Sequence, residues 1–335
     1  MRKIIDKIKQ FFKENYKGIL ILIFIYVFCS YELNFSIYSP GGLINLSDRI
    51  VSNDKIYESK GSINMTYVSL VKGTIPTYLL AKLLPTWDIV PNEDITYDGD
   101  LDETIKIDQY YLEESISNAY KVAYTTAKVD FEIKKSNNYV TYIYEKAKTD
   151  LKLFDNILKY DNIEFTTFKT MQDYITNKNV GDKITFLVDR NGKQLDCYAE
   201  LIDLNGDAKV GVTAAVVNEY ESDTNIDIKS KKSESGSSGG FMMTLAIYDA
   251  LTKEDITKGK KIAGTGTIDE LGNVGEIGGV IYKLSGAVKN EANIMFVPVD
   301  NYEEALEYKK KHNFDIELIS ISNFKEAIEY LEKNE

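Results

Sequence analysis

The chain has 335 residues, and its 40 Lys+Arg against 52 Asp+Glu give a formal net charge of −12 at pH 7. This balance argues against a nucleic-acid binder, because neutralising phosphates requires a surplus of Lys and Arg. With 44% hydrophobic and 27% charged residues, the sequence is that of a folded chain of about two domains. Two cysteines and one histidine, His312, exclude a disulfide framework and a multi-histidine zinc site, so we expect no metal and no cofactor.

The N-terminus combines a basic arm with an apolar stretch. Residues 1–17 hold six Lys/Arg and two acidic residues, and residues 18–31 carry no charge. Fourteen uncharged residues fall short of the roughly 20 that span a bilayer, so the prediction of an anchor helix over 18–38 depends on Lys17 snorkelling and on Leu33 to Tyr38 lying at the outer interface. Positive charge on the cytoplasmic side predicts a single-pass protein of the cell membrane, with a cytoplasmic N-terminus and the rest outside the cytoplasm. A buried core helix and a cleaved signal peptide are the alternatives.

Several elements follow in chain order. Residues 63–71 alternate as a strand should, 79–84 predict a short helix, 91–109 an acidic loop, and 111–127 an amphipathic helix. From residue 138 the pattern changes to short strands at 139–144, 163–165, 183–189 and 194–202, with a helix at 168–176. Asn191-Gly192 between the last two strands is a hairpin signal.

The order of these later elements resembles a PDZ domain, which we place at residues 128–204. Such domains bind extended peptide ends by adding them as a strand to an exposed edge. Asn137 to Val140 occupies the place of the peptide-binding loop, although it lacks the glycines usual there. The resemblance implies peptide binding by Asn138, Tyr139 and Val140. The alternative is a spacer domain whose groove is unused.

A glycine-rich turn comes next. Gly236-Ser237-Ser238-Gly239-Gly240 precedes an uninterrupted helical pattern over residues 241–251, which delivers a serine to a helix N-terminus. Free backbone N–H groups there can stabilise an oxyanion in acyl transfer or a phosphate in nucleotide binding. A flexible linker is the alternative, because residues 230–238 are rich in Ser, Lys and Gly.

A lysine follows at a second helix start. After a strand at 261–268 and a hairpin, a helix begins behind Gly278-Gly279 and carries Lys283 beside three apolar residues, Val280, Leu284 and Ala287. If burial lowers the pKa of this amine by about three units, Lys283 becomes a workable general base at neutral pH. The alternative is a surface lysine with a snorkelling side chain.

These motifs together resemble the proteolytic domain of the Lon family, a serine-lysine peptidase, over residues 205–335. The family's G-P-S-A-G motif matches residues 236–240, and its I-G-G-x-x-x-K matches 277–283. The resemblance implies Ser238 as nucleophile, Lys283 as general base, and Thr265 as the threonine that holds the lysine. It also implies that the remaining residues of the turn shape an oxyanion site, namely Gly236, Ser237, Gly239 and Gly240. Ser235, Ser237 and Gly239 depart from the family's acidic residue, proline and alanine.

The whole chain resembles membrane-anchored, PDZ-containing Lon-like proteases, which implies an α+β fold with an N-terminal membrane helix and an inserted or preceding PDZ domain. The expected order is a basic arm (1–17), an anchor helix (18–38), a first part of the protease fold (39–127), the PDZ domain (128–204) and the proteolytic domain (205–335). The strand at 63–71 and the helix at 111–127 would then belong to a protease domain that the PDZ domain splits.

The resemblance implies an ATP-independent serine endopeptidase, since no G-x-x-x-x-G-K-S/T stretch occurs. Expected partners are polypeptide substrates and the membrane, with no nucleic acid and no nucleotide. A homo-oligomer stays open, since Lon proteins form rings. The main alternative is a non-catalytic PDZ adaptor or scaffold that binds protein termini at the membrane, and a nucleotide-binding anchor protein is a third.

Overall fold

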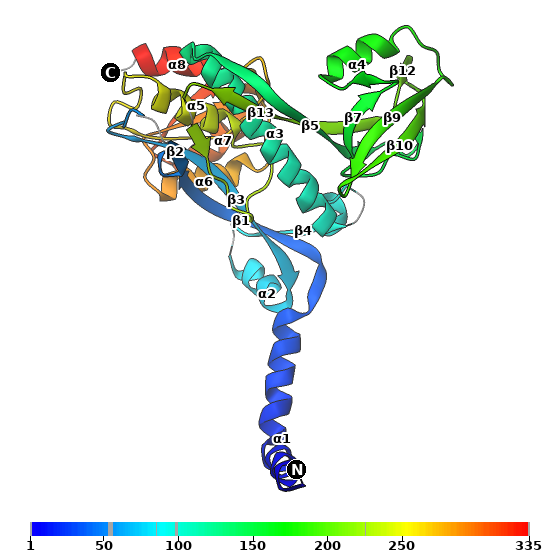
Figure 1. Ribbon diagram of the computed structural model, residues 1–335. Coiled ribbons are helices and arrows are strands. Elements are labelled where there is room, and N and C mark those ends of the chain that lie inside the picture. The colour runs from blue at the N-terminus through cyan, green and yellow to red at the C-terminus, as the bar shows by residue number, and fades with distance from the viewer. Residues whose placement is uncertain (1, 53–55, 85, 98–99, 225, 334–335) are drawn as a thin grey trace. The chain divides into compact units, whose positions relative to one another are not determined.

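A computed structural model describes residues 2–52, 56–84, 86–97, 100–224 and 226–333 (Figure 1). The chain divides into two compact units, one formed by residues 1–41 and 68–101, the other by residues 42–67 and 102–335. Two long strands, β1 (Glu32–Asn45) and β3 (Ser62–Thr74), contribute residues to both units.

The first unit contains α1 (Arg2–Ser30), α2 (Ile75–Leu83) and β4 (Asp88–Pro91). The anchor helix predicted to reach residue 38 ends at Ser30, because β1 begins at Glu32 and pairs with β4 from Phe35↔Pro91 to Tyr38↔Asp88. The helix predicted at 79–84 begins earlier, because Thr74 and Thr77 form a reciprocal capping box. Within the described part of the chain, no helix is both long enough and apolar enough to cross a membrane.

The second unit is built on a parallel sheet. β15 (Lys261–Gly264) lies between β3 and β18 (Ile294–Pro298), and β18 pairs in turn with β19 (Glu317–Ile321). Every residue of β18 is buried, and its side chains alternate between two cores. Phe296 packs with α5 (Gly240–Leu251) and α8 (Phe324–Lys333), whereas Val297 packs with α6 (Val280–Lys289) and α7 (Val299–His312). Helices therefore cover both faces of this sheet, as parallel sheets require.

Helix α3 (Leu101–Ala127) belongs to the same core as α5. Leu112, Ala119 and Val122 recur at helical spacing and are buried there, which confirms the helix predicted at 111–127. The loop predicted over 91–109 is wrong from residue 101 onward, because buried Ile107 continues the apolar face and two acidic residues favour the helix start. Residues 98 and 99 of that predicted loop lie outside the described residues.

Between α3 and α5 the chain forms a separate body over residues 131–222, drawn mostly in green in Figure 1. Its sheet has the order β13-β5-β7-β9-β10-β6, with a core of its own around Val140, Ile157 and Phe186. The main elements are β5 (Phe131–Ile143), β7 (Asn156–Tyr160), α4 (Phe168–Ile175), β9 (Lys183–Arg190), β10 (Lys193–Glu200) and β13 (Val212–Ser222). Residues before and after this body, such as Val122 and Ile226, share the core that also contains α5 and Phe296, so the body is an insertion. It extends past residue 204, because β13 pairs with β5 along its whole length.

The remaining strands are short. They are β2 (Ile50–Ser52), β6 (Lys148–Thr149), β8 (Ile163–Glu164), β11 (Ile202–Leu204), β12 (Asp207–Lys209), β14 (Ile226–Ile228), β16 (Thr267–Ile268) and β17 (Val274–Gly275). β16 and β17 form the hairpin predicted before the lysine helix, with Thr267 opposite Gly275.

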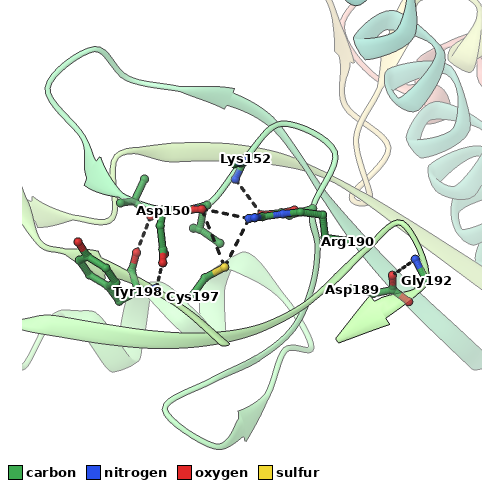
Figure 2. A network of polar contacts seen from close by, with 10 residues as sticks. Asp150, Lys152, Asp189, Arg190, Gly192, Cys197 and Tyr198 are labelled. Atoms are coloured by element: carbon green, nitrogen blue, oxygen red, sulfur yellow. Dashed lines mark hydrogen bonds and ion pairs between the residues drawn. The ribbon is translucent and has the colours of Figure 1, made fainter. Parts of the chain in front are cut away.

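An ion pair in the inserted body ties its loop before β7 to β9. Arg190 donates to both carboxylate oxygens of Asp155 at 2.7 Å. Its Nη2 also donates to the Asp150 carbonyl at 3.0 Å (Figure 2). The Asp155 side chain is fully buried. Removing one partner of a buried pair leaves the other charge uncompensated, so the pair matters for stability.

We expect Asp155→Ala to lower the free energy of unfolding of this body by roughly 3 kcal/mol. The exposed pair between Lys134 and Glu221 is the matched control, and Glu221→Ala should cost less than about 1 kcal/mol. Denaturant unfolding of the full chain, followed by a probe in the inserted body, measures both. Equal effects of the two substitutions would contradict the structural role of Asp155.

Candidate active site

The turn before α5 is fixed by contacts to α3. Gly236 has φ of 87°, a left-handed conformation that favours glycine, and its N–H donates to the Asp108 carbonyl at 2.8 Å. The Ser115 hydroxyl donates to the Ser237 carbonyl at 2.9 Å. A Cβ atom on Gly240 would lie 2.1 Å from the Ser115 Oγ, so only glycine fits at that position. The helix α3 therefore positions the turn that carries the two serines.

The backbone of Ser238 is held from the other side by the segment after β15. Its carbonyl accepts from the Gly266 N–H at 2.8 Å and from the Thr265 hydroxyl at 3.0 Å. Ser238 is half-buried, whereas Gly239 and Gly240 are buried. Within the described part of the chain, the N–H groups of Ser238 and Gly239 donate no hydrogen bond. Two backbone donors at a helix N-terminus are thus available to a developing oxyanion.

Lys283 lies in the first turn of α6, behind Gly279, whose φ of 68° sets the helix start. Its side chain is buried beside the core formed by α6, α7 and one face of the sheet, which includes Val280 and Leu284. Desolvation lowers the pKa of the Lys283 amine to about 7. About half of the molecules then carry a neutral amine at pH 7, so the residue can accept a proton there. The sequence prediction of a desolvated lysine agrees with this geometry.

Thr265 connects the lysine to the serine turn. Its hydroxyl oxygen accepts from Lys283 Nζ at 3.1 Å and donates to the Ser238 carbonyl. Thr265 is fully buried. No hydrogen bond joins Ser238 Oγ to Lys283 Nζ among the described residues, which is common for catalytic pairs without substrate. The structure thus brings the three predicted residues together through the threonine.

His312 lies away from this turn, at the end of α7. Its ring lies 4.3 Å from that of Tyr308 and 5.4 Å from that of Phe314, centroid to centroid. The imidazole therefore serves aromatic packing at the helix end. Within the described residues, no group of three or more His, Cys, Asp or Glu side chains is arranged to hold a metal ion.

A cavity of about 390 Å³ adjoins the serine turn. It is lined by Ser237, by one face of α3 (Tyr111, Glu114, Ser115 and Asn118) and by the β16–β17 hairpin. Burial raises the pKa of Glu114, and its Oε1 accepts from the Val216 N–H at 2.9 Å. Sequence reasoning missed the α3 residues, because they lie more than 100 positions before the serine. The i, i+3, i+4, i+7 spacing of these polar residues was the available signal.

The structure places Asn138, Tyr139 and Val140 inside strand β5 and not in a loop, and peptide binding by these residues stays a prediction. Asn138 and Val140 are buried, and Val140 exchanges hydrogen bonds with residues 154 and 155. Tyr139 packs on Tyr110 of α3, with ring centroids 4.3 Å apart. These side chains therefore belong to the interior of the inserted body and to its contact with α3.

The open groove of the inserted body lies elsewhere. A cavity of about 690 Å³ is lined by the C-terminal half of α4 and by residues 204–213, together with Tyr144. Gly211, with φ of 77°, directly precedes the edge strand β13 on one wall of this groove.

Comparison with known families supports the assignment of the C-terminal part. Residues 219–333 match the family described as the Lon protease (S16) C-terminal proteolytic domain. Ser238, Thr265 and Lys283 all lie within the matched range. β3 and α3 lie outside it, although they share the core of the same domain. The match confirms the resemblance to Lon-like proteases predicted from the sequence, and a Lon proteolytic domain indicates a serine-type peptidase.

Several solved structures are similar to a part of this chain. A PDZ domain of an SdrC-like protein from Listeria monocytogenes is 22% identical, covering 25% of this chain and 92% of that chain, with a TM-score of 0.23. A PDZ domain of an SdrC-like protein from Listeria innocua is 26% identical, covering 23% and 92%, with a TM-score of 0.22. No curated protein matches the chain.

Proposed function

We propose that this chain is an ATP-independent serine endopeptidase in which Ser238 is the nucleophile and Lys283 the general base. The observation that carries the proposal is the buried Lys283 amine, with its pKa near 7, joined through Thr265 to the Ser238 backbone. A neutral amine next to a helix-start serine is the arrangement that a serine-lysine hydrolase needs. The absence of a phosphate-binding motif in the sequence supports ATP independence.

The chemistry follows from these positions. The neutral Lys283 Nζ takes the proton of the Ser238 hydroxyl while Oγ attacks the substrate carbonyl carbon. The N–H groups of Ser238 and Gly239 stabilise the oxyanion of the tetrahedral intermediate. The ammonium then protonates the leaving amine, and the acyl-enzyme is hydrolysed by a water that Lys283 deprotonates. Thr265 keeps the amine oriented through each proton transfer.

We also propose that the inserted body captures substrate. The groove between α4 and residues 204–213 borders an edge strand, and an edge strand can accept an extended polypeptide as an additional strand. Without an ATP-driven unfoldase, the substrates are flexible tails or unfolded chains.

A simple test of the proposed chemistry is its pH dependence. We expect kcat/KM for peptide hydrolysis to rise with pH through a single ionisation near pH 7, and to level off above it, because only the neutral lysine accepts a proton. His312→Ala should leave the profile unchanged. Loss of the ionisation in His312→Ala would assign the base to the histidine and would contradict the proposal.

The cellular location is likewise a proposal. Side chains from Leu20 to Val27 are about half or more exposed on all sides of α1, although nearly all of them are apolar. A helix that is apolar all round needs an apolar environment, which the membrane offers. Positive charges precede this stretch, so the proteolytic domain would lie outside the cytoplasm.

Membrane fractionation checks this location. We expect the full chain to stay in the membrane fraction after alkaline carbonate washing, and we expect protease added to intact cells to digest the region after residue 38. A chain that lacks residues 1–31 should be recovered in the soluble fraction. Recovery of a soluble natural form that begins near Ser30 would indicate cleavage instead of anchoring.

A further inference from the structure

The two cavities of the second unit are close neighbours. Thr213 lines the larger cavity in the inserted body, and Tyr111 lines the smaller one beside the serine turn. The buried Thr141 lies between them, with its Oγ1 3.2 Å from the Thr213 hydroxyl and 3.1 Å from the Tyr111 hydroxyl. Two hydrogen bonds therefore separate the groove of the inserted body from the cleft at the serine turn.

Strand β13 runs from one cavity toward the other. It is the terminal strand of its sheet, so among the described residues one of its edges has no strand partner. Farther along this strand, the N–H groups of Val216 and Asn218 donate to Glu114 Oε1 at 2.9 Å and to Ser117 Oγ at 3.0 Å. Side chains of α3 thus close the edge of β13 from Val216 onward.

A polypeptide that pairs with the start of β13 would therefore reach a defined end point. It can follow the edge only from Gly211 to about Val216, because the Val216 N–H already donates to the Glu114 carboxylate. Glu114 itself lines the smaller cavity together with Ser237, which precedes the proposed nucleophile. Glu114 therefore closes the free edge of β13 and also lines the cleft at the serine turn.

We propose that a single extended polypeptide substrate occupies both cavities at once, paired with β13 between Gly211 and Val216 and then crossing α3 at Tyr111 and Glu114 to reach Ser238. This inference rests on the proposed endopeptidase function and adds a length requirement to it. The stretch along β13 takes about five residues at roughly 3.3 Å each, and crossing a helix takes several more. A substrate needs roughly ten residues to span both cavities.

The inference predicts that kcat/KM rises sharply once a substrate is long enough to occupy both cavities. A chain held on β13 presents its continuation to the cleft at a high effective concentration, so long substrates gain over short ones without new contacts at the serine. We expect kcat/KM of the full chain to rise at least about tenfold between unstructured fluorogenic peptides of six and sixteen residues that share the same cleaved sequence. Peptides longer than sixteen residues should gain little more.

Two exposed positions on α4 separate this inference from a general preference for long peptides. Gln172 lines the larger cavity and Lys169 does not. In Gln172→Trp, kcat/KM for the sixteen-residue peptide should be close to that for the six-residue peptide, because the indole fills the groove. Lys169→Trp should keep the ratio of the unsubstituted chain. Binding of the same fluorescent peptides to the full-length Ser238→Ala variant, followed by anisotropy, should show the same step in length.

The outcomes are distinct. Serine-dependent hydrolysis with no step between six and sixteen residues, or a step that survives Gln172→Trp, would overturn the inference while the endopeptidase function stands. Absence of Ser238-dependent hydrolysis of every peptide would overturn the proposed function. In that case, peptide binding to Ser238→Ala would still be informative. If sixteen-residue peptides bind more tightly than six-residue peptides, and adding Gln172→Trp removes the difference, one polypeptide occupies both cavities.

Discussion

Ser238→Ala should abolish the hydrolysis of peptides and unfolded proteins, with kcat lowered by at least about 10³-fold. The substitution removes the only atom that forms the acyl-enzyme. It leaves the carbonyl of residue 238, which holds the turn to Thr265 and Gly266, in place. The free energy of unfolding should change by less than about 0.5 kcal/mol, because the half-buried hydroxyl makes no hydrogen bond among the described residues. Initial rates and a thermal unfolding curve measured on the same preparation test both statements.

Ser237→Ala is the matched control for this prediction. Ser237 contributes its carbonyl to the contact with Ser115, and the substitution preserves that carbonyl. We therefore expect measurable activity in Ser237→Ala. Loss of activity in Ser237→Ala but not in Ser238→Ala would shift the nucleophile by one position. If the unsubstituted chain hydrolyses nothing and still binds peptides, the non-catalytic adaptor is the better description.

Local patterns predicted the parts of the site that depend on short stretches of sequence. The serine turn and the lysine each sit at a helix start marked by glycines, and glycine at these positions has a conformational reason: Gly236 and Gly279 adopt left-handed φ angles. The apolar spacing of α3 reflects one buried face, which is readable from the sequence, whereas Ile63 to Thr66 of β3 are buried in succession because this part of the sheet is covered on both faces. The family match over 219–333 agrees with this C-terminal reading.

Other features depend on contacts that no local pattern encodes. Residues 32–38 were expected to continue the anchor helix as a mixed polar and apolar stretch, yet residues 35–38 pair with β4, 50 or more positions later. Asn138 and Val140 were expected to bind peptide, but β5 is enclosed by pairing with β13, which lies more than 70 positions later. The groove is instead formed where α4 meets residues 204–213, and this meeting depends on the closure of the whole sheet. Pairing of distant strands therefore explains these differences, whereas the earlier starts of α2 and α3 depend on local capping and on acidic residues in the first turn.

Lys283→Met should be as inactive as Ser238→Ala, because methionine keeps an unbranched apolar side chain and removes the proton acceptor. The double variant should be no worse than either single variant, since members of one catalytic unit are not additive. Thr265→Val tests the remaining member. It removes the hydroxyl that bonds Lys283 Nζ, and we expect a partial loss of activity, on the order of tenfold to a hundredfold. Full activity in Lys283→Met would refute the serine-lysine assignment.

Lys283→Met should also stabilise the fold at neutral pH, whereas most substitutions of buried residues destabilise a protein. The pKa of Lys283 falls from 10.5 to about 7 on folding, so between these values the unfolded chain binds one more proton than the folded chain. Stability of the unsubstituted chain must therefore rise with pH across this window, and below about pH 7 the full cost of burying the ammonium is present. Lys283→Met lacks this cost and should be more stable by on the order of 4 kcal/mol at pH 7. Denaturant unfolding of both proteins from pH 6 to 10 measures the difference, which should shrink as the pH rises. A constant difference would mean that Lys283 is not desolvated in the folded protein.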